Sequence, residues 1–484
     1  MEPLKQLFAQ FTGELPESVE ELPSSGSNRR YFRMRPKGAG AGISGGPDTG
    51  GASLIGVQGS CEAENRAFWH LARHFRSKGL PVPEVYAHSD DFQYYIQQDL
   101  GSGMLFDKVA EGRAAGHYAP HEEALLIKSV QLLPKIQFEG GRGLDFSVCF
   151  PQPEFDAQTV AFDQNYFKYC FLKATGLEFD EMALEEDFRR MASILVSETG
   201  DTFMYRDFQS RNIMIYNGEP YLIDFQGGRR GPVCYDIASF VWQARANYDE
   251  GLRNRLVSAY IDSARRYTDI DEERFHARLR HFVLFRTLQV LGAYGFRGYF
   301  EKKPHFLQSI PYAVDNLRRL LATPFEEYPY LNSLLDRLTR MPEFASAREG
   351  QLEVEIYSFA FKKGIPDDNS GNGGGYVFDC RGLDNPGKYE HYRHFTGLDR
   401  EVIDFLEERG EVHEFLSRIF PMAEAHVRRY IERKFTHLMF SFGCTGGQHR
   451  SVYCASRLAE YLSGRFSGIR IIVRHRELDK EIRL

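Results

Sequence analysis

The chain has 484 residues, of which 42% are hydrophobic and 26% charged, and its formal net charge at pH 7 is -7. This length suggests two or three folding units, and the composition excludes a disordered or collagen-like chain because it supplies enough apolar residues for sizeable cores. The negative net charge argues against a general attraction to nucleic acid or to anionic membranes. The net charge does not exclude a local basic patch on the surface.

The cysteines and the hydropathy pattern indicate a cytoplasmic protein. The seven cysteines form no CxxC pair and show no spacing typical of a zinc site, so reduced thiols explain them most simply. Nowhere do about 18 apolar residues run together, as a membrane-spanning helix requires. We therefore expect no structural zinc and no contact with a membrane.

The sequence pattern changes between residues 340 and 350. Residues 351–484 hold 20 basic and 20 acidic side chains and seven of the 15 histidines, so the preceding residues carry the whole net charge. We expect one unit at 1–345 and a second at 351–484.

In the first unit, alternating apolar residues predict strands, and apolar residues at helical spacing predict a helix over 61–78. The strands are expected at 30–35, 53–58 and 93–98. Between the first two strands, the Gly-rich segment 36–52 lacks the GxxxxGK[ST] pattern, so we interpret it as a hairpin insertion. From about 101 to 321 the pattern is mainly helical, interrupted by one hairpin.

That hairpin carries the strongest candidate site. It reads YRDFQSRN, IMIY, NGEP, YLI and then DFQ. We expect NGEP to form a four-residue turn, which brings Asn212 and Asp224 to the same end of the ribbon, with Asp207 on the loop that enters this end. Phosphoryl transfer needs such a group, with one carboxylate for the attacking hydroxyl and a carboxylate plus an amide for Mg2+. A surface hairpin with turn-forming Asp and Asn is the alternative.

The spacing of these three residues resembles the aminoglycoside phosphotransferase and choline kinase-like family. The resemblance implies an α+β, protein-kinase-like bilobal fold, with a β-rich N-lobe to about residue 98 and a helical C-lobe over 99–345. It implies ATP as phosphoryl donor, Asp207 as catalytic base, and Asn212 and Asp224 as Mg2+ ligands. Arg206 and Asp236 would support the catalytic loop, although a helix N-cap explains Asp236 equally well.

Within this family, SSGSNRRYFRMR, ENRAFWHLARHFRSKGLPVPEVY and YRDFQSRNIM are most similar to the AmgK-like anomeric kinases of N-acetylmuramate and N-acetylglucosamine, over about residues 20–320. A sugar substrate and a set of nucleotide-binding residues follow from this resemblance: Ser25, Gly26 and Ser27 in the turn 24–28, Arg30, Glu64, and Gln98 and Leu100 at the hinge.

The chain departs from the family pattern at one position. The strand over 54–57 carries no Lys to bridge the phosphates and Glu64. Arg30 or Arg33 offers a positive charge instead, or either is simply a solvated strand residue. The departure leaves open a non-catalytic, ligand-sensing scaffold.

The second unit is expected to hold an anion site. Strands are predicted over 352–359, 376–380 and 437–442, and helices over 400–408 and 411–434. The last strand is followed by GCTGGQHRS and then by apolar residues at helical spacing. The free backbone N–H groups of this Gly-rich turn and the positive end of the helix make it suited to bind an anion. The spacing from Cys444 to Arg450 is also that of cysteine phosphatases, although Gly443 stands where a His is expected.

FAFKKGIP, FDCRGLDNP, TGLDREVIDFL, GCTGGQHRSVY and RHREL resemble the C-terminal domain of RapZ, the RNase adapter, an α/β domain, over 352–478. The resemblance implies a pocket for a phosphorylated amino sugar, lined by Asp379, Arg381, Asn385, Cys444, Thr445, Gly446, Gly447, Gln448, His449, Arg450, Ser451, His475 and Arg476. The RapZ domain also binds small RNA. That role is open here, because the P-loop domain and the basic tail of the well-known adapters are absent. The sequence thus predicts an ATP- and Mg2+-dependent sugar kinase joined to a metabolite-sensing domain, of unknown oligomeric state.

Overall fold

The computed structural model describes residues 1–23, 29–37, 52–197, 200–246, 248–307, 309–341, 344, 352–368, 374–433, 435–466 and 469–484. Two compact units divide the chain: Met1–Phe296 with Tyr312–Met341, and Arg297–Pro311 with Pro342–Leu484. Ser25, Gly26 and Ser27, and most of the Gly-rich segment 36–52, lie outside the described residues. Among the described helices, none is long and apolar enough to cross a membrane.

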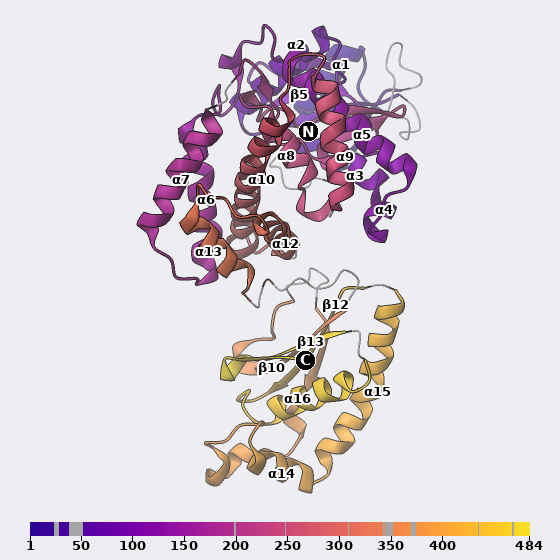
Figure 1. Ribbon diagram of the computed structural model, residues 1–484. Helices are drawn as coiled ribbons and strands as arrows, with labels where there is room; N and C mark the ends of the chain where they lie inside the picture. The colour runs from indigo at the N-terminus through magenta and orange to yellow at the C-terminus, as the bar shows by residue number, and fades with distance from the viewer. Residues whose placement is uncertain are drawn as a thin grey trace. The chain divides into compact units, whose positions relative to one another are not determined.

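The N-terminal part of the first unit is a five-stranded antiparallel sheet between two helices (Figure 1). The strand order is β1 (Ser18–Leu22), β2 (Arg30–Arg35), β3 (Leu54–Gln58), β5 (Tyr94–Gln98) and β4 (Val85–His88). The helices are α1 (Glu2–Thr12) and α2 (Glu62–Ser77). Because side chains alternate along a strand, Phe32 and Met34 pack against α1, whereas Tyr95 faces α2 and stacks on Phe68 with ring centroids 5.2 Å apart.

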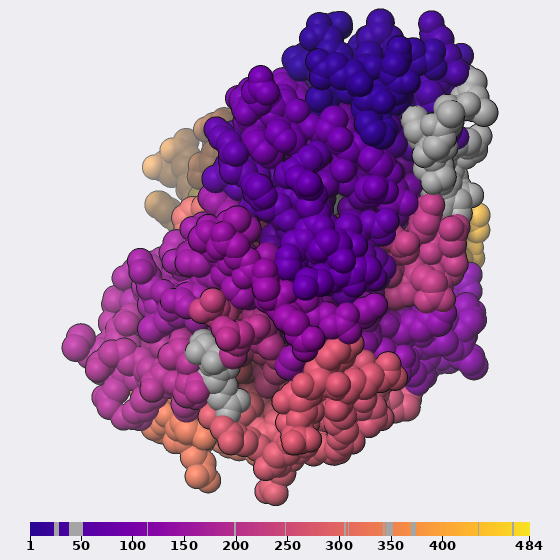
Figure 2. Space-filling view, turned by 90° about the horizontal axis from the view of Figure 1, so that it is seen from above, coloured from indigo at the N-terminus to yellow at the C-terminus, as the bar shows by residue number. Residues whose placement is uncertain are grey.

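The remainder of this unit is mainly helical. Figure 2 shows the indigo residues of the N-terminus gathered at one end of the view. The long helix α10 packs against α6 and α8. The helices are α3 (Leu105–Lys108), α4 (Ala110–Ala115), α5 (Pro120–Pro134), α6 (Ala157–Phe167), α7 (Glu181–Val196), α8 (Cys234–Val241), α9 (Glu250–Ala264), α10 (Glu272–Gly295), α12 (Ile310–Leu321) and α13 (Pro329–Thr339). The short helix α11 (Pro304–Leu307) lies in the segment Arg297–Pro311, which belongs to the second unit.

Several of these helices begin at an aspartate. The carboxylates of Asp156, Asp180, Asp249 and Asp271 accept backbone N–H groups in the first turns of α6, α7, α9 and α10. Such caps satisfy donors that the helix itself leaves open, and each contributes about 1 kcal/mol.

The hairpin consists of β7 (Ile213–Tyr216) and β8 (Glu219–Leu222) and differs from the expectation in its turn. Tyr216 pairs with Glu219, so the turn has two residues, Asn217 and Gly218, both with positive φ. This is the conformation that two-residue hairpins favour. The turn is shorter than the expected four residues because Glu219 and Pro220 already lie within β8.

The second unit is an α/β domain with the strand order β11-β12-β10-β13-β14. β10 (Glu353–Ala360) pairs in parallel with β12 (His437–Cys444) and β13 (Arg470–His475), β11 (Tyr376–Asp379) is parallel to β12, and β14 (Lys480–Arg483) is antiparallel to β13. The helix α16 (Arg450–Ser463) packs on the three central strands, and α14 (Arg400–Glu408) and α15 (Glu411–Glu432) complete the helical layer (Figure 1).

Candidate active site

The loop before the hairpin is held by a buried carboxylate. Asp236, in the first turn of α8, is fully buried and accepts hydrogen bonds from the backbone N–H groups of Tyr205 (2.9 Å) and Arg206 (2.8 Å). The side-chain amide of Gln137 donates a third hydrogen bond (3.0 Å). The Asp236 carboxylate therefore joins α8 to the loop, and Asp236 is not the N-cap of α8, because that position is held by Val233, which makes no side-chain cap hydrogen bond.

The backbone is strained on both sides of the hairpin, in the loop before β7 and in the turn after β8. Arg206 and Asp224 have φ angles of 76° and 66°, values that L-residues with side chains adopt at a cost. Arg206 also forms an ion pair with Asp163 of α6, 3.4 Å apart, and Gln289 of α10 donates to the other Asp163 oxygen (2.8 Å). Three helices thus fix the loop around Arg206.

The structure brings together the three side chains expected from the hairpin. The amide nitrogen of Asn212 donates to the backbone carbonyl of Asp207 (2.8 Å), and Ile223 N–H donates to the carbonyl of Asn212 (3.0 Å), so Asp224 follows directly at the open end of the ribbon. A Cβ atom added to Gly227 would lie 4.0 Å from Asp207 Oδ2, which shows how closely the turn after Asp224 passes the first carboxylate.

Burial dominates the electrostatics of this site. It raises the pKa of Asp224, and the nearby carboxylates of Asp207 and Glu64 add to the increase, against the hydrogen bond from Gln226 and the positive charge of Arg29. Burial also raises the pKa of Asp236 to about 6, although three hydrogen bonds lower it.

The donor set fits a hard divalent cation. Asp224 supplies carboxylate oxygens, and because the Asn212 nitrogen is engaged with the backbone, the Asn212 amide oxygen is the atom left for a ligand. Carboxylate and amide oxygens are the ligands that Mg2+ prefers. An opposite charge at the site would also offset the cost of burying the Asp224 carboxylate.

A polar chain connects this site to the sheet. Arg29 Nη2 lies 3.3 Å from Glu64 Oε1 of α2. The amide nitrogen of Gln226 donates to the same Glu64 oxygen (3.3 Å) and to Asp224 Oδ1 (2.6 Å). The sequence analysis did not identify Arg29 or Gln226, although the second stands in the DFQ motif that it quoted.

The two arginines that the sequence analysis considered in place of the missing Lys do not lie at Glu64. Arg30 points away from Glu64 and forms an exposed, bidentate pair with Glu21 of β1. Arg33 is buried and donates to both carboxylate oxygens of Asp99 (2.6 and 3.2 Å), which also accepts from Ser53 (2.8 Å). Neither arginine therefore contacts Glu64, because each is already engaged by a carboxylate.

The hinge residues join the two parts of this unit. Gln98 N–H donates to the Glu84 carbonyl (2.8 Å), and the Gln98 side-chain oxygen accepts from Glu84 N–H (3.3 Å). Leu100 is buried, and Gly101 N–H donates to Asp99 (2.8 Å). The Gln98 side-chain oxygen is thus engaged by the protein itself.

In the second unit, β12 leads into the Gly-rich turn and α16 begins at Arg450. Cys444 is buried; its Sγ accepts from Gly447 N–H (3.1 Å) and lies 3.2 Å from Ser451 Oγ. Exposed on the turn are Thr445, Gly446 and Gln448. The expected residues near this turn engage neighbouring groups: Asp379 pairs with Arg381, Asn385 accepts from Gly387 N–H, and His449 hydrogen-bonds the Tyr392 carbonyl.

Three residues expected in the anion pocket have other contacts. Arg450 is buried and donates to the backbone carbonyls of Arg381 (3.0 Å) and Leu383 (2.9 Å). His475 is fully buried between two serine hydroxyls, and burial lowers its pKa to about 4, so it is neutral at pH 7. Arg476 donates to the Gly364 carbonyl (2.8 Å). The sequence could not show these orientations, because the carbonyl and hydroxyl partners come from distant segments.

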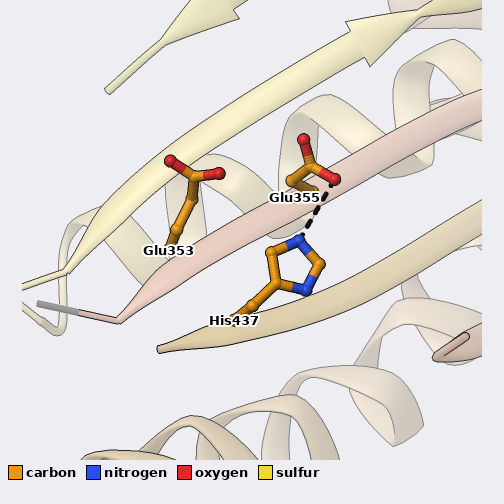
Figure 3. A group of neighbouring side chains, drawn as sticks. All are labelled: Glu353, Glu355 and His437. Atoms are coloured by element: carbon orange, nitrogen blue, oxygen red, sulfur yellow. Dashed lines mark hydrogen bonds and ion pairs between the residues drawn. The ribbon is translucent and has the colours of Figure 1, made fainter. Parts of the chain in front are cut away.

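Glu353, Glu355 and His437 form the one group of potential metal ligands found among the described acidic, histidine and cysteine side chains (Figure 3). His437 Nε2 lies 3.2 Å from Glu355, as the dashed line in Figure 3 marks. Arg470 pairs with Glu353 (3.2 Å) and Arg474 pairs with Glu355. Because arginines already compensate both carboxylates, we assign no metal to this group.

Two family models match the chain. Residues 18–276 match the phosphotransferase enzyme family, and residues 352–479 match the RapZ C-terminal domain. The expected kinase-like fold, with an N-terminal sheet and a helical region, and the separate RapZ-type α/β domain are thereby confirmed.

The similar curated proteins match part of the chain. A "nucleotide-binding protein" of Glaesserella parasuis is 35% identical over 180 residues, which are 36% of this chain and 60% of that protein. The RNase adapter protein RapZ of Yersinia pseudotuberculosis is 43% identical over 140 residues, which are 28% and 44% of the two chains. The chain thus spans about half the length of these relatives.

The similar solved structures are remote in sequence. An ADP-bound aminoglycoside phosphotransferase, APH(2'')-Ib, aligns with a TM-score of 0.45 at 14% identity, and the alignment covers 67% of this chain and 98% of the phosphotransferase chain. A choline/ethanolamine kinase family protein from Mesorhizobium loti aligns with a TM-score of 0.42 at 14% identity, covering 69% and 98%.

Proposed function

Because this chain belongs to the phosphotransferase enzyme family, we propose that its first unit transfers a phosphoryl group from ATP, bound with Mg2+, to a sugar hydroxyl. The acceptor is a cell-wall amino sugar such as N-acetylmuramate or N-acetylglucosamine. The observation that carries the proposal is the meeting of Asp207, Asn212 and Asp224 at one end of the hairpin.

Each residue has a distinct task in this reaction. Asp207 orients the acceptor hydroxyl and accepts its proton as the new bond to phosphorus forms. Asp236 and Arg206 fix the loop so that this carboxylate is already positioned when the substrate binds. Asn212 and Asp224 would hold Mg2+, which when bound offsets negative charge on the phosphate oxygens.

The preference for an amino sugar rests on sequence resemblance. The motifs SSGSNRRYFRMR and YRDFQSRNIM are similar to those of anomeric amino-sugar kinases. The second unit matches the RapZ C-terminal domain, and its sequence resemblance to that domain implies a phosphorylated amino sugar, so both halves favour the same class of compound.

The test is ATP consumption by the full chain with N-acetylmuramate, N-acetylglucosamine or glucosamine, followed by phosphorus NMR of the product. The Asp207→Ala protein is the negative control. A sugar phosphate made only by the wild type supports the kinase, and its chemical shift identifies the phosphorylated hydroxyl. Tight nucleotide binding without turnover on any of these sugars would instead favour a ligand-sensing scaffold.

For the second unit we propose binding of a phosphorylated amino sugar at the turn 445–449. The observation in favour is that backbone groups and the start of α16 gather there, next to the exposed Thr445 and Gln448. Arg450 would act by holding the neighbouring loop, because its guanidinium is bound to the carbonyls of Arg381 and Leu383. Binding of small RNA is the second proposal for this domain, suggested by its match to the RapZ C-terminal domain.

Glucosamine-6-phosphate and inorganic phosphate, each titrated into the full chain and followed by thermal shift, test the metabolite site. The sugar phosphate should raise the melting temperature more than phosphate does, and Gly446→Asp should abolish the difference by placing a negative charge on the turn. Equal increases of the melting temperature with both compounds would show that the site binds anions in general and does not recognise the sugar.

A further inference from the structure

A buried arginine lies where the sheet of the first unit meets α2. Arg29 precedes β2 and is 3% exposed. Alternation along the strand places its side chain on the same face as Tyr31 and Arg33, whereas Phe32 and Met34 pack against α1 on the opposite face. Arg29 therefore faces the α2 side of the sheet, as does the ring of Tyr95 that stacks on α2.

The neighbouring strand supplies no charge on this face. Ile55 and Val57 of β3 pair with Arg33 and Tyr31, so they lie on the same face of the sheet as Arg29. Both side chains are apolar and buried. Among the described residues, Arg29 is the basic side chain that pairs with Glu64.

Two groups on α2 position the guanidinium. Glu64 pairs with it at 3.3 Å, and Phe68, one helical turn later, lies beneath it with the ring centroid 5.9 Å away. Gln226 links the same Glu64 oxygen to Asp224. The arginine on the sheet is thus connected through one carboxylate to the candidate metal ligand on the hairpin.

We propose that Arg29 binds the β- and γ-phosphate oxygens of the nucleotide and that Glu64 positions it for this contact. The inference rests on the proposed phosphotransferase function. A guanidinium presents two parallel N–H donors to phosphate oxygens and keeps its charge at any relevant pH. It also offsets the negative charge of Glu64, Asp224 and Asp207, which would otherwise repel a triphosphate.

Nucleotides with and without the β- and γ-phosphates distinguish phosphate contacts from contacts to adenine. Titration calorimetry with the full chain and Mg2+ measures the affinity for AMP-PNP, which has β- and γ-phosphates, and for AMP, which has neither. Arg29→Gln should weaken AMP-PNP binding by about 10- to 100-fold, the loss expected for hydrogen bonds to charged groups, and leave AMP binding within about twofold. Arg29→Lys should recover part of the AMP-PNP affinity, because it restores the charge but not the planar fork.

Arg66→Gln is the matched control, since Arg66 is an arginine on the exposed side of α2 that pairs with Glu62 instead of Glu64. Its AMP-PNP affinity should equal that of the wild type. Unchanged AMP-PNP affinity in both Arg29 variants, with a wild type that binds, would overturn the role of Arg29 alone. A wild type that binds neither nucleotide would overturn the proposed function, and with it this inference. If Arg29→Gln fails to fold by circular dichroism, Arg29→Lys decides: wild-type affinity for both nucleotides overturns the proposal, and a selective loss for AMP-PNP supports it.

Discussion

Asp236→Asn tests whether a carboxylate that positions the catalytic loop lowers the stability of the fold at neutral pH. Burial raises the pKa of Asp236 to about 6, from an ordinary value of 3.8. This difference corresponds to about 3 kcal/mol, at 1.36 kcal/mol for each pKa unit. Because the folded protein binds this proton more tightly than the unfolded chain, the free energy of unfolding falls as the pH rises from 3.8 to about 6.

Asparagine does not titrate, so the stability of the variant relative to the wild type should increase by about 2 kcal/mol between pH 4.5 and pH 7. A separate loss of about 1–3 kcal/mol applies at every pH, because an amide cannot accept hydrogen bonds at both positions where the carboxylate accepts from Tyr205 and Arg206. Turnover should fall as well, since the loop loses one of these anchors.

Urea unfolding at several pH values between 4.5 and 7, followed by circular dichroism, measures the difference. Asp156→Asn, which removes the carboxylate that caps α6, is the control for a general effect of losing an acceptor of backbone N–H groups. A difference between wild type and Asp236→Asn that stays constant with pH would refute the reasoning. Constant turnover would show that the anchor does not position the loop.

Three further outcomes are expected. Asp207→Asn should lower turnover by about 100-fold or more and leave nucleotide affinity unchanged, as measured by a coupled assay and calorimetry; retained turnover would exclude a base at this position. Burial lowers the pKa of His475 to about 4, so as the pH falls from 6.5 the unfolded chain takes up the proton before the folded protein does, and the free energy of unfolding decreases. His475→Gln should reduce this decrease, as measured by urea unfolding at several acidic pH values. Added Zn2+ should leave the melting temperature unchanged, because arginines compensate Glu353 and Glu355; a rise that Glu355→Gln removes would instead indicate a metal site.

Local sequence pattern predicts much of this fold. The strand at 30–35 has the bounds expected from alternation, and α2 differs from the expected helix by one residue at each end. The sequence analysis did not identify α1 and β1. Both elements bury few side chains, so their apolar pattern is weak: in α1 Leu4, Leu7 and Phe8 are buried, and β1 has no buried residue.

The site was predictable as far as spacing along the chain determines it. Asn212 and Asp224 meet because strand pairing brings together the residues that flank the hairpin, and the two-residue turn places Asn212 opposite Ile223, next to Asp224. The partner of Glu64 was not predictable in this way, because it comes from another strand and depends on which face each arginine occupies. For Arg450, burial of its guanidinium against distant carbonyls decides its orientation, and no local signal reports that.

The left-handed backbone at Arg206 sets two selective pressures against each other. Glycine adopts a φ of 76° without the cost of about 1–2 kcal/mol that a residue with a side chain incurs. A search for heat-resistant variants would therefore favour glycine at this position and remove the ion pair to Asp163. Selection for catalytic rate would retain the arginine, so a population evolved for thermal endurance alone should lose activity first at this residue.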